Sequence, residues 1–181
     1  MEAAAQLFER DGYTKSTTNR IAERAGVSIG SLYQYFPNKD ALLYAIGERH
    51  MHQLVAEIAA LTKELRHTLP QLAHCVRALV HGLAAPHLTR PRVHRLLYDQ
   101  APRPAEAAAR LRAVQDGIAR EVEFHLRRLG VGGPDPALTA LLLVQGVEAQ
   151  LHGALLEPPP GHTVEEVIGA VEALCLKCLA P

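Results

Sequence analysis

The sequence predicts an all-α protein, in which a three-helix helix-turn-helix head is followed by a six-helix body. Two observations support a helical fold: apolar residues recur at spacings of three and four, and proline and glycine separate the stretches that show this spacing. A third observation argues against strands, because no stretch alternates apolar and polar residues with a period of two. We expect the head at residues 1–47 and the body at residues 48–181.

The composition is that of a globular protein, with 48% hydrophobic and 21% charged residues among 181. The formal net charge is zero, which alone would argue against a nucleic-acid-binding protein. No stretch reaches the roughly 20 apolar residues of a membrane span, and no export leader opens the chain. Three cysteines are too few for a disulfide framework. We therefore expect a cytoplasmic protein that does not contact a membrane.

Residues 17–39 predict two short helices joined by a tight turn. Two threonines can cap the first helix, and Gly26 ends it because glycine readily adopts a positive φ. Ser28 can cap the second helix, which we expect over Ile29–Tyr35. Ala22 and Gly26 are small and lie one turn apart, so the two helices can cross closely. This is the geometry of a helix-turn-helix.

The second of these helices has an unusual outward face. That face combines small, hydroxyl-bearing and amide residues, namely Gly30, Ser31, Tyr33, Gln34 and Tyr35, whereas Leu32 points inward. Such groups can bind phosphates and base edges. Four basic side chains against one acidic side chain give residues 13–39 a local charge of 4 − 1 = +3. A plain helical hairpin with a solvated polar face would also fit this pattern.

The head resembles the DNA-binding head of the TetR family of bacterial transcriptional regulators. The resemblance is carried by AAAQLFERDGY (residues 3–13) and TTNRIAERAGVSIGSLYQYFPNKDALL (residues 17–43), in which S-x-G-S-L-Y-x-Y-F-x-x-K is highly specific. It is nearly gapless and covers about a quarter of the chain. In one respect the chain departs from the family, whose members usually show several further residues, often basic, before the first helix.

The resemblance assigns DNA contacts to nine positions of this chain. They are Thr18, Asn19, Ser28, Gly30, Ser31, Tyr33, Gln34, Tyr35 and Lys39. We expect two tyrosines, Thr18 and Lys39 to hold phosphates. We expect Gln34, Ser31 and the backbone at Gly30 to contact base edges.

Proline and glycine residues, which interrupt helices, set the expected bounds of the other helices. These helices are Ala3–Arg10, Lys39 to about Arg66, Pro70 to about Ala84, Val93–Gln100, Pro104–Leu129, Ala137–Leu156 and Thr163 to about Leu179. A loop with Pro86 and Pro91 and a hard break at residues 101–104 separate some of them. Thr163 and Glu166 have the spacing of a capping box.

The last two helices carry small residues along one stripe, which lets helix backbones approach closely. This stripe fits packing within one subunit, but the resemblance implies a four-helix dimer interface. The expected interface residues are Leu143, Gly146, Val147, Gln150, Gly153, Val171, Leu174 and Cys178. We therefore expect a two-fold homodimer.

The ligand pocket is weakly encoded in the sequence. The candidates are Tyr98, Phe124 and His125. A histidine beside an apolar stripe is more often a core residue whose hydrogen bonds are made within the protein than a ligand-binding residue. The chain has no tryptophan, so an aromatic cage for an organic cation is not expected. We expect a mainly aliphatic cavity that suits a neutral or acidic apolar ligand.

Two further patterns suggest metal or redox chemistry, and both have a simpler structural reading. His67, His74 and His81 recur every seven residues, so their side chains lie about 10 Å apart along one helix face and cannot share one ion. We expect a solvated or pocket-lining polar stripe and no metal. Cys175 and Cys178 form a C-x-x-C without a second pair, so we expect buried packing near the dimer seam rather than redox or metal sensing.

We thus expect a ligand-responsive transcriptional regulator, specifically a repressor that binds a near-palindromic DNA operator as a homodimer and is released by a small molecule. We expect no enzyme and no cofactor, because phosphate-loop, G-x-S-x-G and H-E-x-x-H motifs are absent from the sequence. The alternative is a ligand-binding helical dimer whose head docks on a protein rather than on DNA.

Overall fold

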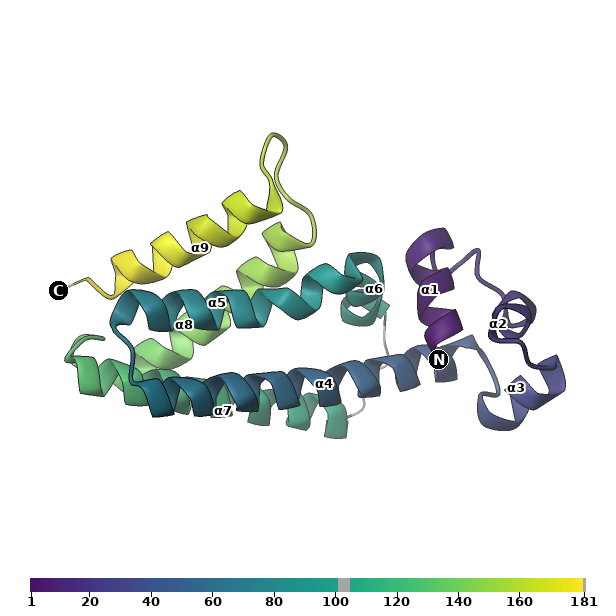
Figure 1. The fold of residues 1–181 in the computed structure, drawn as a ribbon, viewed down its shortest axis with the longest axis horizontal. Coiled ribbons are helices and arrows are strands. Elements are labelled where there is room, and N and C mark those ends of the chain that lie inside the picture. Colours follow the sequence, from purple (N-terminus) through teal and green to yellow (C-terminus); the bar gives the residue numbers. More distant parts are fainter. Residues whose placement is uncertain (101–104, 181) are drawn as a thin grey trace. The chain divides into compact units, whose positions relative to one another are not determined.

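The computed structural model describes residues 1–100 and 105–180, which form nine α-helices, one π-helical turn and no β-strand (Figure 1). The elements are α1 (Glu2–Asp11), α2 (Thr18–Ala25), α3 (Ile29–Tyr35), α4 (Lys39–Thr68), α5 (Leu72–Thr89), α6 (Pro91–Gln100), α7 (Ala105–Leu129), α8 (Pro136–Gln150), η1 (Leu151–Leu155) and α9 (Val164–Cys178). The all-α prediction is confirmed. The expected break at residues 101–104 lies outside the described residues. Among the described helices, none combines the length and apolar character that crossing a bilayer requires.

The chain divides into two compact units. The head unit contains α1, α2, α3, α4 as far as Gln53, and α6, and the body unit contains Leu54–Leu88, α7, α8, η1 and α9. The sequence analysis, which relied on the positions of proline and glycine, assigned α6 to the body. In the structure, Val93 of α6 is buried in the same core as α1, and its N–H donates to the Glu9 carboxylate at 2.9 Å.

Local side-chain caps fix the helix-turn-helix. The Thr17 hydroxyl accepts the Arg20 N–H at 3.3 Å, and Gly26 ends α2 with a left-handed φ of 68°. The Ser28 hydroxyl accepts the Ser31 N–H at 3.0 Å, which starts α3 at the predicted residue. Leu32 is the buried residue of α3 and joins the head core. The capping chemistry of the sequence therefore determines where the helix-turn-helix begins and turns.

Helix α4 begins as the sequence predicts, since the Asn38 side chain accepts the Ala41 N–H at 2.8 Å. The helix contributes residues to both units. In the body unit, Ile58 and Leu65 are buried, and Leu54 packs against the core cluster that contains Ile58. The helix ends at Thr68, and the next residue, Leu69, has a φ of 45°, so it is the one non-glycine residue with a left-handed backbone among those described.

Replacing Leu69 with asparagine should stabilise the protein. Asparagine tolerates the left-handed region better than leucine, and Leu69 is half exposed, so little packing is lost. We expect the free energy of unfolding, measured in urea, to rise by about 1 kcal/mol. An unchanged or lower urea midpoint would show that this turn is not strained.

Helix α5 is longer than the sequence predicts. It runs through Pro86 to Thr89, so the expected end near Ala84 and the expected loop at Pro86 are wrong. Proline removes one backbone hydrogen bond from a helix interior. The buried Ala84 and His87 flank Pro86, so tertiary packing continues past the proline and offsets that loss.

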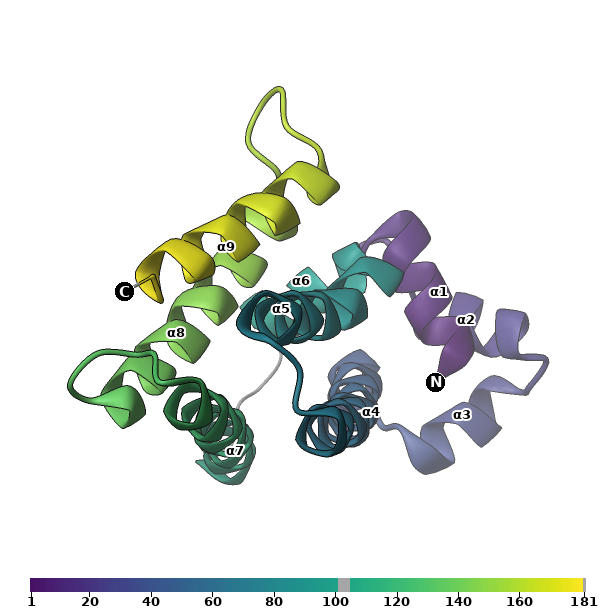
Figure 2. The same cartoon turned by 60° about the vertical axis from the view of Figure 1, so that its left-hand side comes forward.

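In the body unit, α8 lies between α7 and α9 (Figure 2). The prediction of one helix to Leu156 is wrong, because α8 ends at Gln150 and the π-helical turn η1 follows. This turn directs both Leu151 and Leu155 into the main core of the unit. The predicted capping box of α9 is confirmed: the Thr163 N–H donates to Glu166 at 2.8 Å, and the Thr163 hydroxyl accepts the Glu166 N–H at 3.2 Å.

Candidate nucleic-acid interface and body cavity

Helix α3 presents an almost fully exposed face. Exposed side chains or backbone occur at Ser28, Gly30, Ser31, Tyr33, Gln34 and Tyr35. Tyr35 is 78% exposed, whereas Leu32 on the opposite side is only 7% exposed. A β-carbon added at Gly30 would meet only the Ser28 hydroxyl, at 3.8 Å. Helix α3 therefore offers hydroxyl, amide and backbone groups to another molecule.

Four of the predicted DNA contacts also hold the motif together. The Thr18 and Tyr33 hydroxyls are 3.0 Å apart, which links the start of α2 to α3. The Ser28 hydroxyl lies 2.8 Å from that of Ser31 while it caps the helix. Asn19 is exposed beside Thr18. These hydrogen bonds fix the hydroxyls in the positions from which they could reach phosphates.

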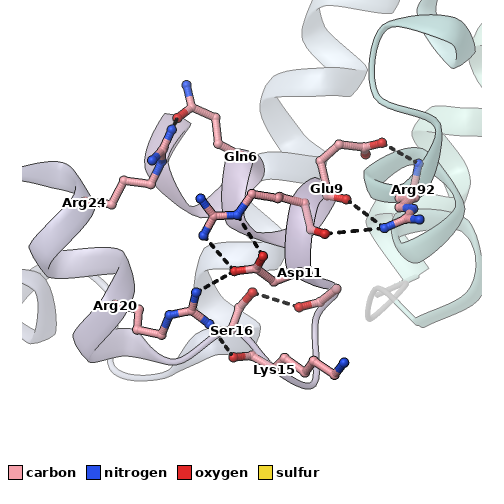
Figure 3. A network of polar contacts seen from close by, with 10 residues as sticks. Gln6, Glu9, Asp11, Lys15, Ser16, Arg20, Arg24 and Arg92 are labelled. Carbon is pink, nitrogen blue, oxygen red and sulfur yellow. Dashed lines mark hydrogen bonds and ion pairs between the residues drawn. The ribbon is translucent and has the colours of Figure 1, made fainter.

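Asp11 organises the basic side chains behind the motif (Figure 3). Its carboxylate pairs with Arg10 at 2.7 Å and with Arg20 at 2.6 Å. The hydrogen bond from Arg10, with a further contribution from Arg20, lowers the pKa of Asp11 to about 2. The Arg20 guanidinium also donates to the Lys15 carbonyl at 3.2 Å, so Asp11 and Arg20 together hold the loop before α2.

Arg24 keeps more of its charge available than Arg20 does. Its Nε donates to the Gln6 amide oxygen at 2.8 Å, and this partner is neutral (Figure 3). Arg20, in contrast, faces the Asp11 carboxylate. The local charge counted from the sequence is therefore partly compensated in the fold, and Arg24 contributes more of the field at this face than Arg20.

Lys39 is more constrained than the sequence indicates. Its ammonium donates to the carbonyls of Tyr13 at 2.7 Å and Ser16 at 3.1 Å, and it lies 4.0 Å from the centre of the Tyr13 ring. The Tyr13 hydroxyl in turn donates to Asp40. Two of the three N–H groups of Lys39 thus stabilise the loop between α1 and α2, and one is left for a phosphate.

Replacing Lys39 with methionine should lower stability as well as DNA affinity. Methionine keeps an apolar stem over Tyr13 but leaves two carbonyls without their charged donor. We expect the free energy of unfolding to fall by about 1–2 kcal/mol, measured by urea denaturation. Lys15→Met changes an exposed lysine nearby and is the control. Equal stability of the two variants would contradict this role of Lys39.

The structure divides the expected dimer residues into two groups. Within the single subunit, Val147 and Val171 are buried in the core of the body unit and the half-buried Leu143 packs against it. The exposed members of the set are Gly146, Gln150, Gly153, Leu174 and Cys178. The sequence analysis missed two exposed leucines of α8, Leu138 and Leu142, at 52% and 58% exposure. Their spacing of four residues could have revealed them.

The body unit contains a cavity of about 60 Å³ between α5, α7, α8 and α9. Its wall is made of aliphatic side chains, Cys75, Cys175 and His125. Of the three ligand candidates, His125 lines this cavity, and Tyr98 and Phe124 are not among its lining residues. Tyr98 is exposed on α6, and the Phe124 ring stacks under the Arg66 guanidinium at 4.2 Å.

The sequence suggests a core histidine whose ring nitrogens both have hydrogen-bond partners, but His125 meets this expectation at only one nitrogen. The Arg128 Nε–H donates to His125 Nδ1 at 2.9 Å, and Cys75 Sγ lies 3.7 Å from the same nitrogen. Nε2 is buried and has no hydrogen-bond partner among the residues the structure describes. Burial and the positive charge of Arg128 lower the pKa of His125, so the ring is neutral. The i, i+3 spacing of His125 and Arg128 on a helix could have revealed this pair.

The neutral state of His125 predicts a pH dependence of stability. The folded pKa lies below the unfolded value near 6.5, so the contribution of His125 is fully present above that pH and decreases as the pH falls. The neighbouring charges are Arg128, Arg66 and Glu121. Urea midpoints measured from about pH 7.5 to pH 5 should fall less steeply for His125→Gln than for the unaltered chain. Parallel curves would contradict a lowered pKa.

The remaining histidine and cysteine patterns have structural roles. His67 lies at the end of α4 and His74 and His81 lie on α5, so the expectation that the three share one helix face is wrong. All three are exposed, and His81 pairs with Glu172 at 2.6 Å. Cys175 is buried in the body core, and burial raises the pKa of its thiol. Cys178 is exposed in the single chain, and its expected burial near a dimer seam stays a prediction.

Two family models match this chain. The model described as "Bacterial regulatory proteins, tetR family" matches residues 1–46, and the model described as "Tetracyclin repressor-like, C-terminal domain" matches residues 70–179. The second match spans more than half of the chain, so the chain belongs to the TetR family of bacterial regulators.

Curated relatives carry regulatory names. The transcriptional regulator HbdR from Aromatoleum is 36% identical over 43% of this chain and 34% of its own length. The fatty acid metabolism regulator of Bacillus subtilis is 30% identical over 48% of this chain and 45% of its own length. The chain thus spans less than half the length of each of these two relatives.

Solved structures share the fold across nearly the whole chain. A TetR/AcrR regulator from Thermobifida fusca superposes with a TM-score of 0.75 at 20% identity, covering 99% of this chain and 96% of that one. FadR from Bacillus subtilis in complex with stearoyl-CoA gives a TM-score of 0.63 at 18% identity, covering 99% and 97%. These structures therefore share the fold of both the head and the body with this chain.

Proposed function

We propose that this protein is a transcriptional repressor that binds a near-palindromic double-stranded DNA operator as a homodimer and is released by a small molecule. The observation that carries the proposal is the exposed face of α3, with Leu32 turned inward and hydroxyl, amide and glycine backbone groups turned outward. We assign DNA binding to residues 1–47, and ligand binding and dimerisation to residues 48–181. The family models that match residues 1–46 and 70–179 support this division.

The groups on α3 divide into two roles. Tyr33 and Tyr35 are exposed phenols at the end of the helix and suit phosphate oxygens. Gln34 and Ser31 can reach base edges, and the open backbone at Gly30 lets the helix approach the groove floor. Thr18, Asn19 and the remaining N–H of Lys39 add phosphate contacts from neighbouring elements.

Dimerisation is supported by the outward faces of α8 and α9. Leu138 and Leu142 on α8 and Leu174 on α9 are each more than half exposed, although these are large apolar side chains. A β-carbon added at Gly146, Gly153 or Gly169 would meet nothing within 4 Å, so a second helix can approach these backbones. A second copy of the chain would bury this surface through a two-fold interface.

Ligand control is supported by α4 and by the body cavity. Helix α4 is continuous from Lys39 at the DNA-binding motif to Thr68 in the body unit, so a change around its second half can alter its first half. The structural relative FadR was solved with stearoyl-CoA, which supports a small-molecule effector for this chain. Structures with and without an effector should differ in the separation of the two α3 helices, and identical separations would end this part of the proposal.

Gel shifts with random duplexes at several salt concentrations, combined with light scattering, test the proposal. We expect a dimer mass and DNA binding whose logarithm falls linearly with the logarithm of salt, at about 0.9 per phosphate contact. A monomer, or a dimer that binds no duplex at any salt concentration, would contradict the proposal. The second outcome would favour a head that docks on a protein.

A further inference from the structure

Helix α6 begins without a side-chain cap of its own. The Arg90 carbonyl accepts the His94 N–H at 2.9 Å, so Arg90 is the residue that precedes the first turn. An arginine side chain has only hydrogen-bond donors, so Arg90 cannot accept the free N–H groups of that turn. Glu9 of α1 accepts them instead, because its carboxylate oxygens lie 3.4 Å from the Arg92 nitrogen and 2.9 Å from the Val93 nitrogen. A side chain of α1 therefore caps α6.

Helix α6 caps α1 in return. The last carbonyls of a helix have no partner within it. The Arg92 guanidinium donates to two such carbonyls of α1, those of Glu9 and Arg10, each at 3.4 Å (Figure 3). Both charges have the favourable sign, because a carboxylate suits a helix N-terminus and a guanidinium suits a C-terminus. Glu9 and Arg92 thus form a reciprocal cap, which fixes the end of α1 to the start of α6.

The same helix α1 holds the helix-turn-helix. Asp11, two residues after Glu9, pairs with Arg20 of α2 at 2.6 Å. One turn earlier on α1, the Gln6 amide oxygen accepts the Arg24 Nε–H at 2.8 Å (Figure 3). Helix α1 is continuous over these residues. The reciprocal cap and the contacts with α2 therefore belong to one rigid element.

Helix α6 follows the body helix α5 after a single residue. Arg90 separates the end of α5 at Thr89 from the start of α6 at Pro91. The Arg90 guanidinium also donates to the Glu2 carboxylate at the start of α1, with one nitrogen at 3.3 Å. Because the connection is so short, a displacement of the end of α5 reaches the start of α6 through the backbone.

We propose that Glu9 and Arg92 are positioning residues for DNA binding, through which α6 holds α1 and α2 in the arrangement that the operator requires. Neither residue contacts DNA in this role. An effector that displaces the end of α5 moves the helix-turn-helix through the reciprocal cap, in addition to any movement of α4. The proposal rests on the proposed function and specifies how its regulation reaches the head.

Hydrogen exchange of the Val93 amide tests the coupling without a variant, because this N–H donates to the Glu9 carboxylate. Coupling between two sites is reciprocal, so DNA that fixes the helix-turn-helix also strengthens the cap. The probe is the operator duplex recovered by binding-site selection. Adding it to the full chain should slow exchange at Val93 by about fivefold or more. Unchanged exchange at Val93, while the amides of α3 become protected, would overturn the proposal.

Variants at Glu9 distinguish a positioning residue from a cap that only stabilises the fold. Glu9→Met removes both acceptor oxygens and keeps a side chain of similar length, so the duplex should no longer slow exchange at Val93. Glu9→Gln keeps one acceptor oxygen and should retain part of the effect. Operator affinity should fall in the same order, by about fivefold or more for Glu9→Met. A Glu9→Met chain that kept the DNA-dependent slowing would contradict the positioning role.

Glu64→Met, at an exposed glutamate of α4 in the body unit, is the control and should match the unaltered chain in both measurements. The same titrations separate this proposal from the proposed function. A chain that bound no duplex at any salt concentration would contradict the proposed function, and this proposal with it. A chain that bound the operator while exchange at Val93 stayed constant would contradict the route through α6 and leave release through α4 in place.

Discussion

Replacing Leu142 with glutamate should convert the proposed dimer to a monomer and weaken operator binding by about 100- to 10,000-fold. Leu142 is 58% exposed at the centre of the apolar α8 face, so the fold of a single subunit does not depend on it. In a two-fold interface, the substitution would place two carboxylates in an apolar seam, one from each subunit. Two heads on one dimer bind as a linked pair, and separated heads lose that advantage.

Light scattering and gel shifts on the same sample measure this effect. Leu69→Glu is the matched control, because it places glutamate at another half-exposed leucine outside α8 and α9. The control should remain dimeric and retain full operator affinity. If Leu142→Glu stayed dimeric with unchanged affinity, the apolar face of α8 would not be the interface.

Replacing Gly30 with leucine should weaken specific DNA binding without unfolding the protein. The new β-carbon would meet only the Ser28 hydroxyl at 3.8 Å, and a non-glycine residue favours a helix by up to about 1 kcal/mol. The added side chain would separate α3 from the groove. We expect operator affinity to fall by at least about tenfold, the size of losing one good base contact.

Gly117→Leu, on α7 of the body unit, is the control for this substitution. An added β-carbon there also meets only an ordinary contact, with Arg120 at 3.9 Å. Both variants should keep the urea midpoint of the unaltered chain or raise it, and only the Gly30 variant should bind the operator more weakly. If Gly30→Leu bound the operator as tightly as the unaltered chain, the N-terminal end of α3 would not lie against DNA.

Sequence reasoning succeeded where one local interaction decides the structure. The start of α3 follows from the Ser28 cap, and the start of α9 follows from the capping box of Thr163 and Glu166. These interactions join residues three positions apart, so they are visible in the sequence. The inward position of Leu32 follows from the same helical periodicity.

Sequence reasoning failed where packing between distant residues decides the structure. Helix α5 runs through Pro86 because buried residues flank it, which no local rule reveals. The bonds from Lys39 to the Tyr13 and Ser16 carbonyls join residues more than 20 positions apart.

A binding-site selection from random duplexes, performed with the purified full chain, tests the central claim most directly. If two α3 helices of a dimer enter successive major grooves, the selected sequences will contain two inverted half-sites. Their centres will lie about 10–10.5 base pairs apart, or a multiple of that spacing. Selected sequences with no shared motif, or with a single half-site lacking two-fold symmetry, would contradict the claim.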